Sequence, residues 1–374
     1  MNFCINVSFA QNGIVEKLLS AARNIGSSDS VLFYRIVEEA FRRDTANLET
    51  RFALINGYVN IANDSVIVSN MRFCSYLSFS PDSKNFAVAC KNGVASVYTL
   101  SGERVVTVRH KDVVNSVVFS PDNKYLLTAS FDLTAKSWEW SGDWFSVFAE
   151  HRGDVVEAKF SPDGQIVATA CADGKVRLWN VYAQNKREFL AHEKGVNSLS
   201  FTPKTANLLT AGNDSCAKIF NLEGVVLQKF KHEDAVISAN ISRNEELLLT
   251  VTKGGNVYLW ETKTMQKVFN QSIGSSVLFA TFSPNGSFFA TAGSDSTTRI
   301  FSCAGKELLL LKHQDKVLHL AFSPDDKYLI TASKDDKVRL WILNPNEILQ
   351  IINEKKLHGN IPLLSRRERR RLGI

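Results

Sequence analysis

The chain has 374 residues, a formal net charge of +6, and a composition that is 44% hydrophobic and 22% charged. These proportions are typical of a globular protein and exclude a disordered chain. No run of eighteen apolar residues is present, and the N-terminus has neither a basic leading segment nor a sustained apolar stretch. We therefore expect no membrane span and no secretory signal, and predict a cytoplasmic protein.

The cysteines indicate neither a metal site nor a redox motif. They are scattered along the chain, without a C-x-x-C pair and without a histidine at zinc-ligand spacing. The sequence also lacks the phosphate-binding loop G-x-x-x-x-G-K-[ST]. We expect reduced thiols and no bound metal or cofactor; the six cysteines are Cys4, Cys74, Cys90, Cys171, Cys216 and Cys303.

The first 60 residues are predicted to be helical. The stretch "VLFYRIVEEAFRRD" places Val31, Tyr34, Val37 and Phe41 at helical spacing. A second helix can begin after Thr45 or Asn47, and an earlier one can occupy residues 12–24. We therefore assign residues 1–60 to an N-terminal helical segment.

Residues 70–341 consist of seven copies of one pattern, spaced 40 or 41 residues apart. Short β-branched or aromatic runs, separated by S-P-D or other polar turns, predict a few antiparallel strands in each copy. The copies align on one position, which is occupied by Phe79, Phe119, Phe160, Phe201, Ile241, Phe282 and Phe322.

Four further positions recur: a histidine, a threonine, an aspartate at a turn, and an aromatic residue. The first copy lacks the first three of these, the fifth has Gly254 in place of the aspartate, and the sixth has Ile273 in place of the histidine. The sets that end in tryptophan and contain all four residues are His110/Thr128/Asp132/Trp138, His151/Thr169/Asp173/Trp179 and His313/Thr331/Asp335/Trp341.

This pattern closely resembles the WD-repeat family, in which each repeat of about 40–45 residues supplies four strands to a propeller blade. No copy contains the literal W-D pair. The resemblance implies an all-β, seven-bladed propeller over residues 61–344, and the offset between repeat and blade makes residues 63–70 the strand that closes the seventh blade. It also implies that the four recurring residues form a hydrogen-bonded network that ties each blade together.

A histidine, hydroxyl residues and an aspartate can also indicate nucleophilic catalysis. Five similar copies of the histidine position argue against this reading, because an enzyme needs one site whereas a scaffold needs many. Only His319 and His358 lie outside the repeated position. We therefore expect no enzymatic activity, and interpret the repeated residues as structural.

The resemblance implies that partners bind on the narrow face of the propeller, through residues just after each histidine and just before each turn aspartate. Apolar residues surrounded by lysines at these positions suit a peptide or protein with apolar anchors and some acidic residues. Alternatively, these side chains pack on one another or are covered by the N-terminal helices. The candidates are Phe73, Lys91, Val113, Asn115, Phe131, Val156, Ile237, Lys253, Leu278, Lys316, Leu318 and Lys334.

Residues 345–374 are predicted to form a helical, basic C-terminal tail. The stretch "NPNEILQIINEKK" suits a helix, and Ser365 and Glu368 match a capping box. The final arginines can be read as a charged surface helix or as a nuclear-targeting or RNA-binding segment. We expect the scaffold to be a monomer within a larger complex. The alternative function is an RNA- or ribosome-associated factor, and the residues that would bind RNA are Arg366, Arg367, Arg369, Arg370 and Arg371.

Overall fold

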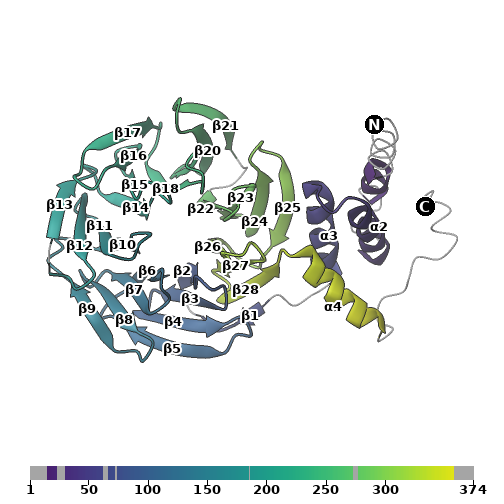
Figure 1. The fold of residues 1–374 in the computed structure, drawn as a ribbon, viewed down its shortest axis with the longest axis horizontal. Coiled ribbons are helices and arrows are strands. Elements are labelled where there is room, and N and C mark those ends of the chain that lie inside the picture. Colours follow the sequence, from purple (N-terminus) through teal and green to yellow (C-terminus); the bar gives the residue numbers. More distant parts are fainter. Residues whose placement is uncertain are drawn as a thin grey trace. The chain divides into compact units, whose positions relative to one another are not determined.

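The computed structural model describes residues 15–22, 30–61, 66–71, 74–184, 186–272 and 277–357. Its strands form seven four-stranded antiparallel sheets, which are the blades of a β-propeller (Figure 1). This confirms the fold class that the repeat predicts.

The blades are numbered in chain order. In each of the first four, the strands follow the sequence from the innermost strand to the outermost. Blade 1 contains β2 (Cys74–Phe79), β3 (Asn85–Cys90), β4 (Val94–Thr99) and β5 (Arg104–Arg109). Blade 2 contains β6 (Val114–Phe119), β7 (Tyr125–Ser130), β8 (Ala135–Glu139) and β9 (Trp144–Phe148). Blade 3 contains β10 (Val155–Phe160), β11 (Ile166–Cys171), β12 (Lys175–Asn180) and β13 (Lys186–Leu190), and blade 4 contains β14 (Val196–Phe201), β15 (Leu208–Gly212), β16 (Cys216–Phe220) and β17 (Val226–Lys231).

The remaining three blades follow in the same order, except that the seventh takes its outer strand from the start of the propeller. Blade 5 contains β18 (Val236–Ile241), β19 (Leu247–Thr252), β20 (Asn256–Glu261) and β21 (Gln266–Ser272). Blade 6 contains β22 (Val277–Phe282), β23 (Phe288–Gly293), β24 (Thr297–Ser302) and β25 (Glu307–Lys312). Blade 7 contains β26 (Val317–Phe322), β27 (Tyr328–Ser333), β28 (Lys337–Ile342) and β1 (Val66–Val68).

Strand β1 closes the ring. It lies antiparallel to β28, with Val66 opposite Arg339 and Val68 opposite Val338 (Figure 1). The pairing covers what would otherwise be an open edge of blade 7. Of the expected closing segment, residues 66–70 are described, and residues 63–65 lie outside the described part of the chain.

The S-P-D motif forms the turn between the first and second strands of a blade. In blade 2 the Ser120 hydroxyl donates to Asp122 (2.6 Å) and accepts the backbone N–H of Tyr125 (2.9 Å). Blades 1, 3 and 7 have the same arrangement, and blades 5 and 6 use Asn244 and Asn285 in place of the aspartate. The recurring serine and aspartate are therefore explained by local turn chemistry.

A separate helical unit contains α2 (Ser30–Arg43), α3 (Leu48–Ile61) and α4 (Pro345–Leu357). Asn47 caps α3, because its side-chain oxygen accepts the backbone N–H of Glu49 at 2.8 Å. Arg51 on α3 donates to the carbonyl of Leu343, just before α4, at 3.1 Å. None of the helices in the described ranges has the length and apolar content that crossing a membrane requires. The expected capping box at Ser365–Glu368 lies outside those ranges.

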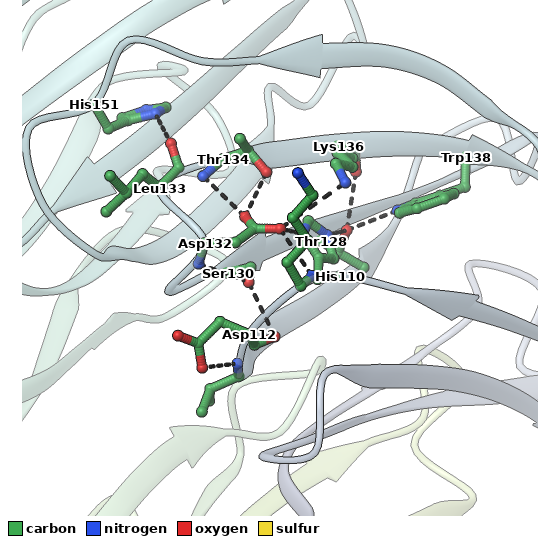
Figure 2. A network of polar contacts seen from close by, with 12 residues as sticks. His110, Asp112, Thr128, Ser130, Asp132, Leu133, Thr134, Lys136, Trp138 and His151 are labelled. Atoms are coloured by element: carbon green, nitrogen blue, oxygen red, sulfur yellow. Dashed lines mark hydrogen bonds and ion pairs between the residues drawn. The ribbon is translucent and has the colours of Figure 1, made fainter.

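Blade 2 contains the full polar network that the resemblance implies (Figure 2). The Thr128 hydroxyl lies 2.7 Å from His110 Nε2 and accepts the indole N–H of Trp138, also at 2.7 Å. The other ring nitrogen of His110 lies 2.8 Å from Asp132 Oδ2. One threonine oxygen thus joins the second strand, the third strand and the preceding loop.

The geometry also fixes the tautomer of His110. A carboxylate only accepts, so Nδ1 carries the proton that is donated to Asp132, and Nε2 accepts the Thr128 hydroxyl hydrogen. Burial lowers the pKa of His110 by more than Asp132 raises it, so the ring is neutral near pH 7. Burial raises the pKa of Asp132, but hydrogen bonds from Thr134 and His110 outweigh it and hold that pKa at about 2.

Blade 3 differs from the expected network in its aspartate. The Thr169 hydroxyl lies 2.8 Å from His151 Nε2 and accepts the indole N–H of Trp179 at 3.0 Å, as its counterpart does in blade 2. Asp173, however, binds Arg177, with the closer pair of atoms 2.7 Å apart. Thr169 and Trp179 are buried, so they tie strands together and are not available at the surface.

The second ring nitrogen of His151 therefore has a different partner from the expected one. His151 Nδ1 donates to the backbone carbonyl of Leu133, in the turn of blade 2, at 3.1 Å. The network of blade 3 thus contains three of its four expected side chains. The histidine now connects two blades instead of binding the aspartate of its own blade.

Blade 7 departs from the expected network in the same way. The Thr331 hydroxyl lies 2.9 Å from His313 Nε2, and Thr331 and Trp341 are both buried. Asp335 binds the guanidinium of Arg339 at 3.2 and 2.6 Å. The expected bond between the aspartate and the histidine is therefore replaced by an ion pair, whereas the histidine and threonine remain together.

The residue four positions after the aspartate explains the difference. Where it is arginine, the aspartate pairs with that guanidinium, as in Asp173, Asp295 and Asp335. Where it is lysine, as in blades 2 and 4, the aspartate also binds the histidine. The guanidinium of Arg177 occupies both oxygens of Asp173, whereas the ammonium of Lys218 binds one oxygen of Asp214 and leaves the other for His192. In blade 2 the ammonium of Lys136 lies 3.9 Å from Asp132 Oδ2, which also binds His110.

Blade 5 keeps half of the network despite lacking the aspartate. Thr250 contacts His232 Nε2 at 2.8 Å and accepts the Trp260 indole N–H at 3.0 Å. No partner for His232 Nδ1 is found among the described residues. The blade-tying contact therefore depends on the threonine, and the aspartate only adds to it.

Replacing Thr128 with valine should lower the free energy of unfolding by about 2 to 3 kcal/mol. Valine has the same shape, so the loss would come from His110 and Trp138 losing a buried partner. Chemical denaturation measures the change. Thr297→Val serves as control, because that hydroxyl binds Asp295 near the surface; equal losses in both variants would contradict the role of the Thr128 hydroxyl.

Acid should weaken the propeller before its carboxylates are protonated. Burial lowers the pKa of His232 and His313 from 6.5 to about 4, and that of His319 to about 3. Below pH 6.5 the unfolded chain binds protons that the folded chain excludes, so the free energy of unfolding should fall between pH 6.5 and 4. Each such histidine contributes a slope of up to about 1.4 kcal/mol per pH unit.

The measurement is chemical denaturation at a series of pH values between 7 and 4, for wild type and His232→Asn. The variant lacks one titrating ring, so it should take up about one proton fewer on unfolding, and its unfolding free energy should depend less steeply on pH. An identical slope in both proteins would show that His232 does not contribute.

Candidate functional site

The predicted partner-binding residues lie at one end of the strands of the propeller, which we call the loop face. It consists of the loops before each innermost strand and the turns between the second and third strands. The two are joined by backbone hydrogen bonds: Phe131 N–H to Val113 O (3.0 Å), Lys253 N–H to Ala235 O (2.8 Å) and Lys334 N–H to Lys316 O (2.8 Å). The structure thus brings Phe131 next to Val113, and Lys334 next to Lys316.

The predicted residues differ in how far they are accessible. Lysines are exposed, at positions Lys91, Lys253, Lys316 and Lys334. The others are half-buried, at positions Val113, Asn115, Phe131, Val156, Ile237, Leu278 and Leu318. Phe73 and the tail residues Arg366, Arg367, Arg369, Arg370 and Arg371 lie outside the described residues.

A β-bulge at the start of every innermost strand separates the half-buried residues into two groups. The pairing register shifts by one residue in all seven blades, as between Val155 and Glu157. The bulged residues are Ser75, Asn115, Val156, Asn197, Ile237, Leu278 and Leu318, whereas Val113 lies before its strand. The repeat alignment agrees, because Val113 is six residues before the aligned position whereas the bulged residues are four before it.

Three of the bulged residues have clear structural contacts. The Asn115 amide donates to the carbonyl of Val156 in the next blade at 2.6 Å, and Asn197 does the same to Val236 at 2.9 Å. Ile237 packs against a buried apolar cluster formed by blades 5 and 6. Asn115 and Ile237 therefore contribute to joining neighbouring blades, whatever else they bind.

Leu133 is a surface feature of the loop face that the sequence analysis missed. It is 44% exposed and has a backbone φ of 67°. At the corresponding turn position, blades 1, 3 and 5 have Gly93, Gly174 and Gly255, which adopt such angles without steric cost. A leucine here is unfavourable by about 1 kcal/mol or more. The signal in the sequence was a large apolar residue at a position that is elsewhere glycine, serine or aspartate.

Leu133 lies in the same turn as Phe131 and Asp132. Figure 2 shows its carbonyl directed at His151, with Asp132 beside it bound to His110 and Thr134. The turn is thus held by its neighbours on both sides, which offsets the strain. It presents an apolar side chain to solvent next to Phe131.

The innermost strands surround the centre of the propeller (Figure 1), where side-chain contacts join neighbouring blades. In three places, a side chain on one innermost strand accepts a backbone N–H from the innermost strand of the next blade. Ser116 accepts from Ala158 (3.2 Å), Glu157 from Leu199 (2.7 Å), and His319 from Leu77 (3.2 Å). The last of these joins blade 7 to blade 1.

An ionic cluster of buried and partly buried side chains extends these contacts. Glu157 accepts the Tyr76 hydroxyl at 2.7 Å and pairs with Lys159 at 2.9 Å, and Lys159 also donates to the Tyr76 oxygen. The His319 ring lies between Tyr76 and Phe279, with centroids 4.2 and 3.9 Å away. Blades 1, 3, 6 and 7 therefore meet in one polar and aromatic cluster.

This cluster resembles a catalytic arrangement in composition only. Burial, and then Glu157, raises the pKa of the Tyr76 hydroxyl, and burial lowers that of His319 to about 3. Neither group is thereby suited to exchange protons near pH 7. Within the described ranges, no three histidine, cysteine, aspartate or glutamate side chains are grouped so as to hold a metal.

Comparison with protein families places repeats on most of the blades. The family described as "WD domain, G-beta repeat" matches residues 102–139, 183–221, 264–302 and 305–341. A second family, described as "WD40 region of Ge1, enhancer of mRNA-decapping protein", matches residues 142–197. Each match falls on strands that the structure assigns to blades.

Curated relatives match one part of the chain. WD repeat-containing protein 1 of Mus musculus is 35% identical over 78 residues, which is 20% of this chain and 13% of the relative. The protein of the same name from Gallus gallus is 37% identical over 73 residues, 18% of this chain and 12% of the relative. Repeats recognised along the chain and seven closed blades lead to one conclusion: the chain belongs to the WD-repeat family and forms a seven-bladed β-propeller.

Proposed function

We propose that this protein is a non-catalytic scaffold that binds a peptide or partner protein on its loop face. Propellers of this family generally bind protein partners. The partner's apolar anchor would contact Val113, Phe131 and Leu133 of blade 2. Its acidic residues would pair with the exposed lysines of blades 1 and 7.

The conformation of Leu133 is the observation that carries this proposal. A leucine that is 44% exposed and has a positive φ is unfavourable for folding, since glycine adopts that φ without steric cost. Unfavourable backbone conformations are concentrated at functional sites, where the side chain itself is needed. Next to the half-buried Phe131, Leu133 supplies the apolar surface that an anchor residue requires.

The lysines support an acidic element in the partner. Lys316 and Lys334 are adjacent through a 2.8 Å backbone hydrogen bond, and both are exposed. The preceding residue, Asp315, accepts the backbone N–H of Lys316 at 2.7 Å through one carboxylate oxygen. Exposed lysines of this kind mainly accelerate and orient association, so their contribution should weaken with salt.

Changing Phe131 and Leu318 together to aspartate should abolish capture of the partner. Phe131→Asp would place a carboxylate where the apolar anchor is expected, and burying it is costly. Leu318→Asp would place a second carboxylate at the bulge of blade 7, where it would oppose the attraction of the blade 7 lysines for acidic residues. Affinity purification followed by mass spectrometry compares the proteins retained by wild type and variant, and thermal melting checks the fold.

Val105→Asp is the matched control, because Val105 is an exposed apolar residue on β5, away from the loop face. It should retain the wild-type set of proteins. If the double variant melts near wild type and still captures that set, the loop face is not the binding surface.

Leu133→Gly should stabilise the fold while weakening binding. Glycine adopts the positive φ without steric strain, so the change should raise the free energy of unfolding by about 1 kcal/mol. It also removes part of the apolar surface that the partner would contact. Ser215→Gly is the control, because Ser215 has a φ of 60° at the same turn position of blade 4. It should stabilise the protein similarly and leave capture unchanged; equal capture by both variants would contradict the role of Leu133.

A further inference from the structure

A groove with a volume of about 530 Å³ lies between blades 2 and 3. The turns that follow β6 and β10 line it, so it lies at the opposite strand ends from the loop face. Blades 2 and 3 are neighbours in the ring (Figure 1). The lining residues on which the inference depends are Tyr125, Ser137, Phe145, Asp163, Gln165 and Tyr182.

Three aromatic rings follow one another along the groove. The centroids of Tyr125 and Phe145 are 4.7 Å apart, and those of Phe145 and Tyr182 are 5.7 Å apart. Tyr182 at the end of this series is 60% exposed. An exposed tyrosine ring backed by a second ring is a suitable surface for a flat cationic group to stack on.

The groove also carries a carboxylate without a cationic partner. Asp163 uses Oδ1 to accept the Ser161 hydroxyl and the Gln165 N–H, and no partner for Oδ2 is found within the described residues. The hydrogen bond from Ser161 lowers the pKa of Asp163, so the group is charged. Lys124 and Asp122 of blade 2 also line the groove, but they pair with each other at 3.4 Å, whereas blade 3 has Gln165 in the lysine position.

A buried hydroxyl adds a third independent feature. Ser137 on β8 is 2% exposed, and its Oγ has no hydrogen-bond partner among the described residues. A buried hydroxyl without a partner is unfavourable, because it has lost its hydrogen bonds to water. A polar group that enters the groove beside Ser137 would therefore recover that loss.

The corresponding groove between blades 4 and 5 lacks these features. It has a volume of about 350 Å³, and no aromatic residue lines it. Its carboxylate, Glu245, already accepts the backbone N–H groups of Lys204 and Thr205. The aromatic series and the available carboxylate are thus not shared by the groove between blades 4 and 5.

We infer that the groove between blades 2 and 3 binds an extended segment of a partner protein through an arginine side chain. The guanidinium would stack on Tyr182 and Phe145 and donate to Asp163, a combination that suits arginine better than lysine. Apolar neighbours of the arginine would pack against Pro121 and Val181 in the lining. This site is independent of the loop face.

The test uses the full chain and fluorescein-labelled heptapeptides with a central arginine flanked by proline, valine or leucine. The same peptides with citrulline in the centre keep the shape and lose the charge. Fluorescence anisotropy should detect binding of arginine peptides, and citrulline should weaken it roughly tenfold or more. The inference is overturned if no arginine peptide binds at millimolar concentration, or if citrulline binds equally.

Variants locate the binding within the molecule. Asp163→Asn and Tyr182→Ala should each weaken the arginine peptides roughly tenfold, whereas Asp82→Asn should not. Asp82 forms the same serine-bonded turn in blade 1 and does not line the groove, so it controls for damage to the turn. Equal losses for Asp82→Asn and Asp163→Asn would overturn the assignment.

Replacing the five arginines of residues 366–371 with glutamine in the full chain tests whether the chain's own C-terminal tail occupies the groove. Unchanged peptide affinity supports a partner segment as the occupant. A clear rise in peptide affinity would assign the groove to the chain's own tail and overturn the inference that a partner segment binds there.

The variant with Phe131 and Leu318 changed to aspartate should bind the peptides normally. Failure of the loop-face proposal can therefore be distinguished from failure of the groove inference.

Discussion

The hydrogen bonds of one threonine hydroxyl determine much of this structure. In blade 2 that oxygen joins the tryptophan of the third strand to the histidine of the preceding loop. The histidine in turn holds the aspartate of the turn that carries Phe131 and Leu133. The loop face therefore inherits its geometry from a network buried beneath it, and the residues of that network are different from the candidate binding residues.

The sequence predicted the architecture because the repeat is a property of all seven copies together. The period, the S-P-D turns and the buried threonines each reflect local chemistry that is repeated from blade to blade. Individual contacts were harder to predict, since they depend on single neighbours. Asp173 and Asp132 occupy equivalent positions, yet an arginine or a lysine four residues later decides which partner each one takes.

The central cluster and the groove could not be predicted from spacing. Glu157 and Tyr76 are 81 positions apart and meet only because the ring closes. Phe145 and Tyr182 likewise belong to adjacent blades. Within the candidate site, Val113 lies before its strand and Val156 is the bulged residue of its own strand, although the two were read as one group. The lysines, which needed only exposure, lie at the surface as expected.

The pairing of β1 with β28 has a consequence for how the protein is made. The strand at residues 66–68 is synthesised before any blade, but its partner at residues 337–342 is synthesised after all the others. Until the ribosome has produced that last strand, blade 7 has no outer strand and the ring cannot close. Completion of the propeller is therefore a late, long-range event in folding, and a chain that stalls or is truncated before residue 342 exposes an unpaired strand edge to aggregation.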